Sequence, residues 1–220
     1  FGCTSFNGVF VRKNHTVSNF KVTMLVYWTE KVTEASYGLF GNVKGTIKNL
    51  TVKDAIVAPN GGRYSAVLVG RLHNGANIEN CHVKSSSATI EHWQVGGIVG
   101  QNNNGNIRNC SISGSTITGM AAVGAIVGMD QHAGEHSIEN CRVENTELVQ
   151  NESFGESYDS TYGLAVGLVN ASGIILHLNN VVVENNTIKG VSSDVLVGEN
   201  EAGSKIIIDG SEILAPGLSY

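Results

Sequence analysis

A six-residue pattern recurs along this chain at intervals of roughly thirty residues, and it constrains the fold more than any other feature. Each copy reads apolar, any residue, Asn, apolar or Cys, any residue, apolar. The copies begin at Val17, Ile47, Ile78, Ile107, Ile138, Leu178 and Ile208. Successive starts lie 29–31 residues apart, except for one interval of 40. Such a period is typical of solenoids, in which each unit buries its apolar face on the next.

The six-residue pattern also predicts where the chain bends. Side chains alternate between the two faces of a strand, so the first position has opposite parity to the fourth and sixth. All three positions are apolar, and burying them together requires a bend between them. Asn at the third position, replaced by Gly210 in the last copy, fits this bend because Asn and Gly tolerate positive φ best.

A second signature precedes each bend and ends in glycine in five copies and in Asn170 in one. The glycines are Gly41, Gly70, Gly100, Gly128 and Gly198. We expect this position to be a left-handed corner. A third short apolar stretch, such as 55–57, follows the six-residue pattern. Each repeat therefore predicts about three short strands separated by corners.

Identical repeats in one orientation favour parallel stacking over an antiparallel sandwich. We predict an all-β, right-handed parallel β-helix of about seven coils. It forms a single domain over 1–220, with a lead-in or cap at 1–16, repeats at 17–213 and a tail at 214–220. First and sixth positions should form interior files, and the Asn side chains should hydrogen-bond from coil to coil. We expect the chain to be a fragment of a larger protein, since it opens at Phe1 without methionine.

The outward second position tests this stacking. It carries Lys48, Glu79, Arg108 and Glu139 in four successive copies, so the charges alternate in sign. Parallel coils would place opposite charges side by side, where each exposed pair contributes roughly 0.2–1 kcal/mol. The alternation supports the register and carries no functional information.

Composition excludes several functional classes. Charged residues make up 15% of the chain, the net charge is −5 and no basic cluster occurs, so nucleic acid is not expected as a partner. No apolar run approaches the roughly 18 residues that span a membrane. Cys81, Cys110 and Cys141 share a repeat position with Leu50, so we expect buried, reduced thiols.

The segments 38–41 (Gly-Leu-Phe-Gly) and 97–100 (Gly-Ile-Val-Gly), each followed by an Ile-x-Asn-Leu/Cys-x-Val/Ile segment, resemble the GLUG repeat. The likeness extends over roughly 17–213 and is closest over 38–143. This family includes N-terminal regions of bacterial IgA-specific metallopeptidases and other surface proteins. The resemblance implies a non-catalytic module of a bacterial cell-surface or secreted protein, and it supplies no catalytic residues.

Two motifs suggest chemistry but have simpler explanations. The segment 132–136 has the His-x-x-Glu-His form of zinc metallopeptidases, a geometry that needs a helix. Here Gly134 falls in an expected turn, so we predict no metal site. Glu144 and Glu184 occupy one file on adjacent coils and could form a glycosidase pair, but surface charges are the commoner case. We predict no catalytic residue and no cofactor.

Aromatic residues near the connecting segments give the better indication of binding. These are Tyr37, Tyr64, Trp93 and Tyr162, which precede the repeated glycine signature. A longer connection in the fifth repeat adds Glu152, Glu156 and Asp159. Variable loops on one side of a solenoid are where binding commonly occurs. These residues could contact a host or cell-surface glycan or protein, although the rings could equally just cover the coil edges.

The sequence thus favours an extracellular or cell-surface β-helix module that serves adhesin-like recognition or acts as a stalk. The first alternative is a carbohydrate-active enzyme or carbohydrate-binding module on the same scaffold. The second alternative is a spacer without a ligand, which predicts a smooth surface with no groove.

Overall fold

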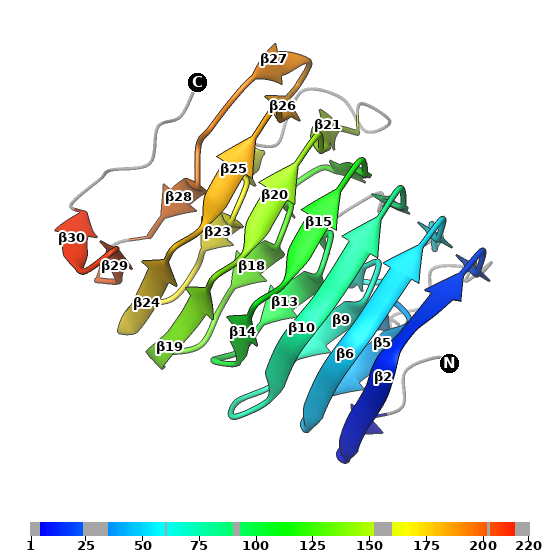
Figure 1. Ribbon diagram of the computed structural model, residues 1–220. Coiled ribbons are helices and arrows are strands. Elements are labelled where there is room, and N and C mark those ends of the chain that lie inside the picture. The colour runs from blue at the N-terminus through cyan, green and yellow to red at the C-terminus, as the bar shows by residue number, and fades with distance from the viewer. Residues whose placement is uncertain are drawn as a thin grey trace.

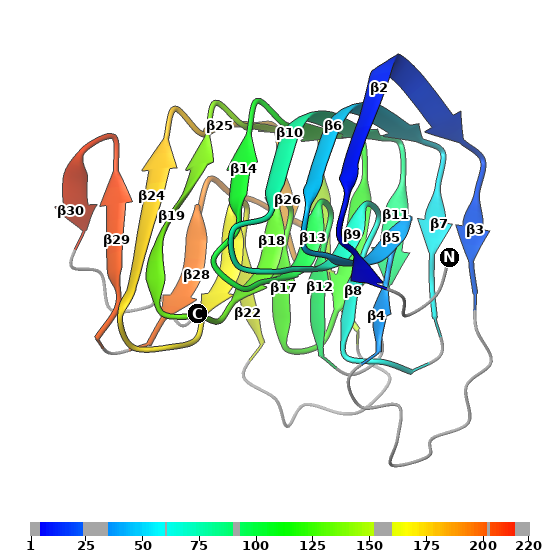
Figure 2. The same cartoon turned by 90° about the horizontal axis from the view of Figure 1, so that it is seen from below.

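The chain folds as a parallel β-solenoid, which confirms the predicted class (Figures 1 and 2). The computed structural model describes residues 5–23, 35–59, 61–89, 93–151, 160–201 and 203–213. Regular structure in these residues consists of β-strands, and none of them forms a helix long and apolar enough to cross a membrane. Strands of successive repeats lie side by side, so each sheet runs along the axis (Figure 1).

Each complete coil contributes to four sheets, one more strand segment than predicted. Sheet 1 contains β4 (Ser36–Tyr37), β8 (Tyr64–Ala66), β12 (Gln94–Gly96), β17 (Ala122–Gly124) and β22 (Thr161–Gly163). Sheet 2 contains β1 (Ser5–Phe6), β5 (Phe40–Val43), β9 (Val69–Leu72), β13 (Val99–Asn102), β18 (Val127–Asp130), β23 (Val166–Val169) and β28 (Val197–Asn200). Sequence reasoning missed sheet 1 as a separate element because only two residues separate each of its strands from the following strand of sheet 2.

The other two sheets complete the coil. Sheet 3 contains β2 (Val9–Ser18), β6 (Thr46–Lys53), β10 (Asn77–Lys84), β14 (Asn106–Arg108), β15 (Ser111–Ser113), β19 (Gly134–Glu139), β20 (Arg142–Glu144), β24 (Ile174–Asn179), β25 (Val182–Glu184), β29 (Lys205–Ile208) and β30 (Ser211–Ile213). Sheet 4 contains β3 (Lys21–Val22), β7 (Ile56–Val57), β11 (Ser87–Thr89), β16 (Thr116–Gly119), β21 (Glu147–Gln150), β26 (Thr187–Ile188) and β27 (Val191–Ser192). Five coils, from β4 to β26, have a strand in every sheet, and partial coils flank them on both sides.

The asparagine bend is confirmed. The third-position residues Asn49, Asn80, Asn109, Asn140 and Asn180 all have φ between 49° and 58°. Strand pairing then aligns the first positions with one another and the sixth positions with one another, and both files enter the core. The amides hydrogen-bond between coils, as Asn80 Nδ2 donates to Asn49 Oδ1 at 2.8 Å and Asn180 Nδ2 to Asn140 Oδ1 at 2.9 Å. These side chains lie at the surface, in half-buried to exposed positions.

The cysteine and charge files also follow the predicted register. Cys81, Cys110 and Cys141 are free thiols, each 1% exposed. Burial raises the pKa of the Cys110 thiol, as expected for a thiol removed from water. On the outer face, Lys48 Nζ lies 2.8 Å from Glu79 Oε2, and Arg108 Nε lies 3.3 Å from Glu139 Oε2.

The glycines that end the second signature are not left-handed corners, so this prediction is wrong. They lie within sheet 2, and none of them has positive φ. Gly167, and not Asn170, continues their file in the fifth repeat, because Val166 pairs with Val127 and Val197. The file requires glycine for space: a Cβ on Gly100 would lie 2.7 Å from the Gly70 carbonyl oxygen and 2.8 Å from the Ser65 nitrogen. The backbones of sheets 1 and 2 therefore approach closely here.

Both ends of the repeat differ from the prediction. In β2, Phe10 pairs with Ile47 and Val17 pairs with Val52, so the first copy is displaced and residues 9–16 belong to a strand of sheet 3. Asn19 has the neighbours of a third-position asparagine, and it also has positive φ. Because Ser18 pairs with Lys53, however, Asn19 lies at the bend that follows the six-residue pattern. At the other end, β30 turns back and pairs antiparallel with β29, placing Ile213 opposite Ile206 and not in the Val183 file. The turn passes through Gly210, which has φ of 81°.

Replacing Gly100 with alanine should destabilise the protein by about 3 kcal/mol or more, because the added methyl group would overlap backbone atoms that cannot move aside. Gly75→Ala is the matched control. Gly75 has φ of +74°, but no atom lies within 4 Å of its added Cβ, so only the backbone strain of about 1 kcal/mol applies. Urea unfolding of both variants measures the difference. Equal losses of stability would contradict the close contact between sheets 1 and 2.

Candidate binding cleft

Sheet 1 presents two files of side chains, and only one of them faces the core. Strand pairing aligns Tyr37, Ser65, Val95, Val123 and Tyr162. The last three belong to the main apolar cluster. Tyr37 and Tyr162 are 2% and 8% exposed. These two tyrosines therefore pack the interior, and the four predicted aromatic residues do not form one row on the surface.

The other file of sheet 1 meets a file of sheet 2 outside the main core. In sheet 1 this file is Ser36, Tyr64, Gln94, Ala122 and Thr161, and in sheet 2 it is Asn42, Arg71, Gln101, Met129 and Leu168. Tyr64, Ala122 and Met129 form a small buried cluster of their own, with Leu168 packed against it. We call the region between these two files the cleft.

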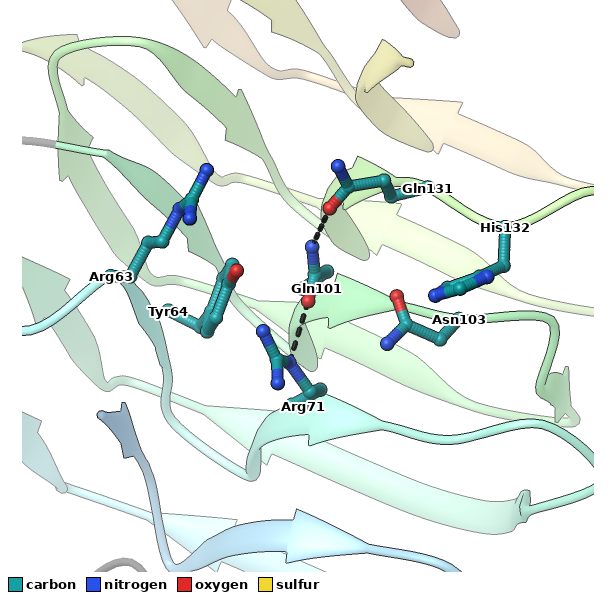
Figure 3. A pocket seen from close by; sticks show the side chains of 7 residues that line it. All are labelled: Arg63, Tyr64, Arg71, Gln101, Asn103, Gln131 and His132. Atoms are coloured by element: carbon teal, nitrogen blue, oxygen red, sulfur yellow. Dashed lines mark hydrogen bonds between the residues drawn. The ribbon is translucent and has the colours of Figure 1, made fainter. Parts of the chain in front are cut away.

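The cleft includes a pocket of about 310 Å³ (Figure 3). Its lining residues are Arg63, Tyr64, Arg71, Gln101, Asn103, Gln131 and His132. Arg71 Nε donates to Gln101 Oε1 at 2.6 Å, and Gln101 Nε2 donates to Gln131 Oε1. This row of hydrogen bonds crosses three successive coils, so the pocket exists only because the coils stack in register.

Arg63 and Tyr64 lie on one side of this row, and Asn103 and His132 lie on the other (Figure 3). The guanidinium of Arg71 lies 4.1 Å from the ring centroid of Tyr64. Arg63 lies 5.3 Å from the ring of Trp93 and 5.7 Å from that of Tyr64. These distances are within the range of cation–π attraction. Of the predicted aromatic residues, the structure thus brings Tyr64 and Trp93 together, and Trp93 remains 38% exposed.

Basic side chains are prominent in the described lining of the pocket. Among the residues that the structure describes, the lining includes Arg63, Arg71 and His132 and no carboxylate, in a chain whose net charge is −5. Nearby, the pKa of His73 is lowered, first by burial and then by the charges of Arg71, Lys44 and His132. Coulombic repulsion between these groups disfavours a further positive charge.

Sequence reasoning missed Arg63, Arg71, Gln101 and Gln131. Arg71 and Gln101 directly follow the file glycines Gly70 and Gly100, so a correct alignment of sheet 2 could have grouped them. The predicted site residues Glu152, Glu156 and Asp159 lie outside the described residues.

The His-x-x-Glu-His segment does not have the geometry of a metallopeptidase site. His132 lines the pocket, whereas Gly134–Glu139 forms strand β19. His136 turns inward, and its Nε2 lies 2.5 Å from Asp130 Oδ2, with both side chains at most 1% exposed. Burial raises the pKa of Asp130, and the hydrogen bond from His136 opposes that rise. Among the residues that the structure describes, no three His, Cys, Asp or Glu side chains converge as metal ligands.

The paired carboxylates of sheet 3 have a structural partner. Arg142 Nε lies 2.5 Å from Glu144 Oε1, and Arg142 Nη2 lies 2.6 Å from Glu184 Oε2. The arginine thus bridges two adjacent coils. In a glycosidase, one carboxyl group needs a raised pKa to act as general acid, and the other needs access to the substrate to act as nucleophile. An arginine that binds both carboxylates favours neither role.

Comparison with known proteins supports the sequence resemblance. Residues 91–118 match the family model described as the GLUG motif, so the predicted likeness is confirmed in that repeat. A crystal structure from Bacteroides ovatus, described as a candidate immunoglobulin A1 protease, is similar to 94% of this chain at 18% sequence identity, with a TM-score of 0.45. This chain spans 64% of that structure. No curated protein was found to be similar.

Replacing His136 with leucine should lower the free energy of unfolding by about 3–5 kcal/mol, because it leaves the buried Asp130 carboxylate without its partner. The double variant Asp130→Val, His136→Leu should recover most of that loss. The register supports these choices, since Leu176 and Val169 occupy the same files one coil later. Urea unfolding at neutral pH provides the measurement. If the double variant were as unstable as the single one, the cost would not come from the unpaired charge.

Proposed function

We propose that this chain is a non-catalytic recognition module of a bacterial surface or secreted protein. Its ligand binds at the pocket in the cleft. One observation carries the proposal. Outward side chains of three successive coils converge on one pocket, where arginines and amides face aromatic rings. Convergent polar groups beside aromatic surface are characteristic of ligand sites.

The chemistry of the pocket favours a glycan over an apolar ligand. Trp93 offers a partly exposed ring beside the lining residue Arg63, and indole rings provide large contact area for the faces of sugars. Asn103 and Gln131 add amide groups, which can both donate to and accept from hydroxyl groups. The GLUG match at 91–118 runs through the coil that supplies Gln101 and Asn103, which supports recognition by the repeat itself.

Two observations weigh against the alternatives. The carboxylates of Glu144 and Glu184, the pair considered for glycosidase chemistry, share Arg142 on a different sheet from the cleft. A spacer without a ligand would have a smooth surface, and the pocket interrupts it. The cell-surface location remains part of the proposal, and the GLUG motif supports it.

A screen of immobilised glycans and host matrix proteins tests this proposal. Trp93→Ala should reduce binding at least tenfold, because it removes the exposed ring without touching the core. Ile56→Ala is the matched control, since Ile56 is an exposed apolar residue, 44% accessible, on sheet 4. It should leave binding unchanged, with both variants retaining the wild-type unfolding midpoint. A screen without any bound ligand would favour the spacer, and unchanged binding by the Trp93 variant would eliminate the cleft.

A further inference from the structure

We infer that Ser111 is an activated nucleophile and a site of covalent acylation, which accepts the acyl group of an activated ester. Ser111 lies on β15 of sheet 3, beside His82 of the preceding coil. Ile112 is fully buried in the core, so the neighbouring Ser111 points to the outer face, where it is half-buried. The cleft belongs to sheets 1 and 2, so this site is separate from it and does not depend on the proposed function.

The hydroxyl of Ser111 has a base within hydrogen-bond distance. Its Oγ lies 2.8 Å from His82 Nδ1. A serine hydroxyl is a weak nucleophile until an adjacent base removes its proton, and this distance suits such a transfer. His82 is also half-buried on the outer face, so both side chains are accessible from the same side of the sheet.

The asparagine ladder decides which ring nitrogen of His82 carries the proton. His82 Nε2 lies 3.3 Å from Asn80 Oδ1, at the bend of the same coil. The Nδ2 group of Asn80 is already engaged, because it donates to Asn49 Oδ1 at 2.8 Å. The oxygen of Asn80 therefore faces the imidazole as an acceptor, and His82 Nε2 supplies the N–H. The unprotonated Nδ1 then accepts the hydrogen bond from the hydroxyl of Ser111.

The imidazole is in the charge state that a base requires. Burial, and then the charge of Lys84, lower the pKa of His82, so the ring is neutral at neutral pH. When the ring takes up the serine proton, its Nε2–H keeps the hydrogen bond to Asn80. Ser111, His82 and Asn80 thus stand in the order of nucleophile, base and orienting group, which is the arrangement that activates hydroxyl nucleophiles.

The acylation step requires only the ester and these side chains. Ser111 Oγ attacks the acyl carbon of an aryl ester or thioester, and its proton moves to His82 Nδ1. The new oxygen–carbon bond forms while the bond from the acyl carbon to the leaving oxygen or sulfur breaks. The leaving phenolate or thiolate takes the proton from the imidazolium, which returns His82 to its neutral form. The product is an alkyl ester of serine, which has a poorer leaving group than the donor and therefore persists.

Ser113 provides a matched control on the same strand. It lies two residues after Ser111 on β15, on the same face, and it is also half-buried. Its neighbours in the register are Lys84 on the preceding coil and Glu144 on the following one. Neither neighbour places an imidazole beside the hydroxyl, so Ser111 has a base that Ser113 lacks.

Treatment of the folded protein with p-nitrophenyl acetate, followed by peptide mass spectrometry, tests the inference. Ser111 should be acetylated about tenfold faster than Ser113 or more, since a positioned general base typically contributes about 10²–10⁴-fold. His82→Gln should remove that advantage, because glutamine keeps a polar side chain but cannot take up the proton. Equal acetylation of the two serines, or acetyl groups on lysines and histidines with none on Ser111, would overturn the inference.

Variants of Asn80 test the orienting role. Asn80→Gly should slow acetylation of Ser111 severalfold, because glycine accepts the φ of 50° at this position but offers no acceptor to His82. Asn80→Asp should restore the wild-type rate or exceed it, since a carboxylate accepts the same hydrogen bond and stabilises the imidazolium. Equal rates in all three proteins would show that Asn80 does not orient the base. Urea unfolding verifies each fold, and the wild-type comparison of Ser111 with Ser113 decides the matter if a variant is unfolded.

Discussion

The left-handed bend at the repeated asparagine is the constraint on which the rest of the structure depends. It places the first position of each repeat on the same side as the fourth and sixth, so that all three enter the core. A shift of one residue would turn each apolar side chain to the opposite face. A second bend follows it, with positive φ at Asp54, Ser85 and Asn145. Buried hydroxyls support that bend, as when Ser86 Oγ accepts a hydrogen bond from the Ala55 nitrogen at 3.1 Å. Both bends recur at equivalent positions in successive coils, which keeps the coils in register.

The glycine file connects this architecture to the candidate site. Because Gly70, Gly100 and Gly128 lack a Cβ, the backbones of sheets 1 and 2 come together without steric overlap. Residues next to those glycines then project outward beside sheet 1. Arg71 reaches the Tyr64 ring, and Met129 packs in the small cluster that this ring forms. The pocket is thus a consequence of how tightly the coil folds, and its chemistry depends on which residues follow each glycine.

The sequence predicted the centre of the solenoid better than its ends. From Ile47 to Leu178, the aligned files, buried thiols and alternating charges occur as the pattern indicated. At the N-terminal end, Asn19 has the neighbours and the positive φ of a third-position asparagine but belongs to the second bend. A local pattern cannot distinguish two bends that place the same demand on the backbone. At the C-terminal end, Gly210 turns β30 back on β29, where the pattern had indicated another parallel strand.

The sequence by itself determined the period, the parallel stacking and the composition of the core, because parity, positive φ and apolar spacing act between residues close along the chain. The tertiary structure alone decided which outward side chains meet. Tyr64 and Arg71 lie seven residues apart, but Gln101 and Gln131 come from the next two coils. Their meeting depends on the close approach of sheet 1 to sheet 2. Backbone contacts between coils about thirty residues apart bring the two sheets this close.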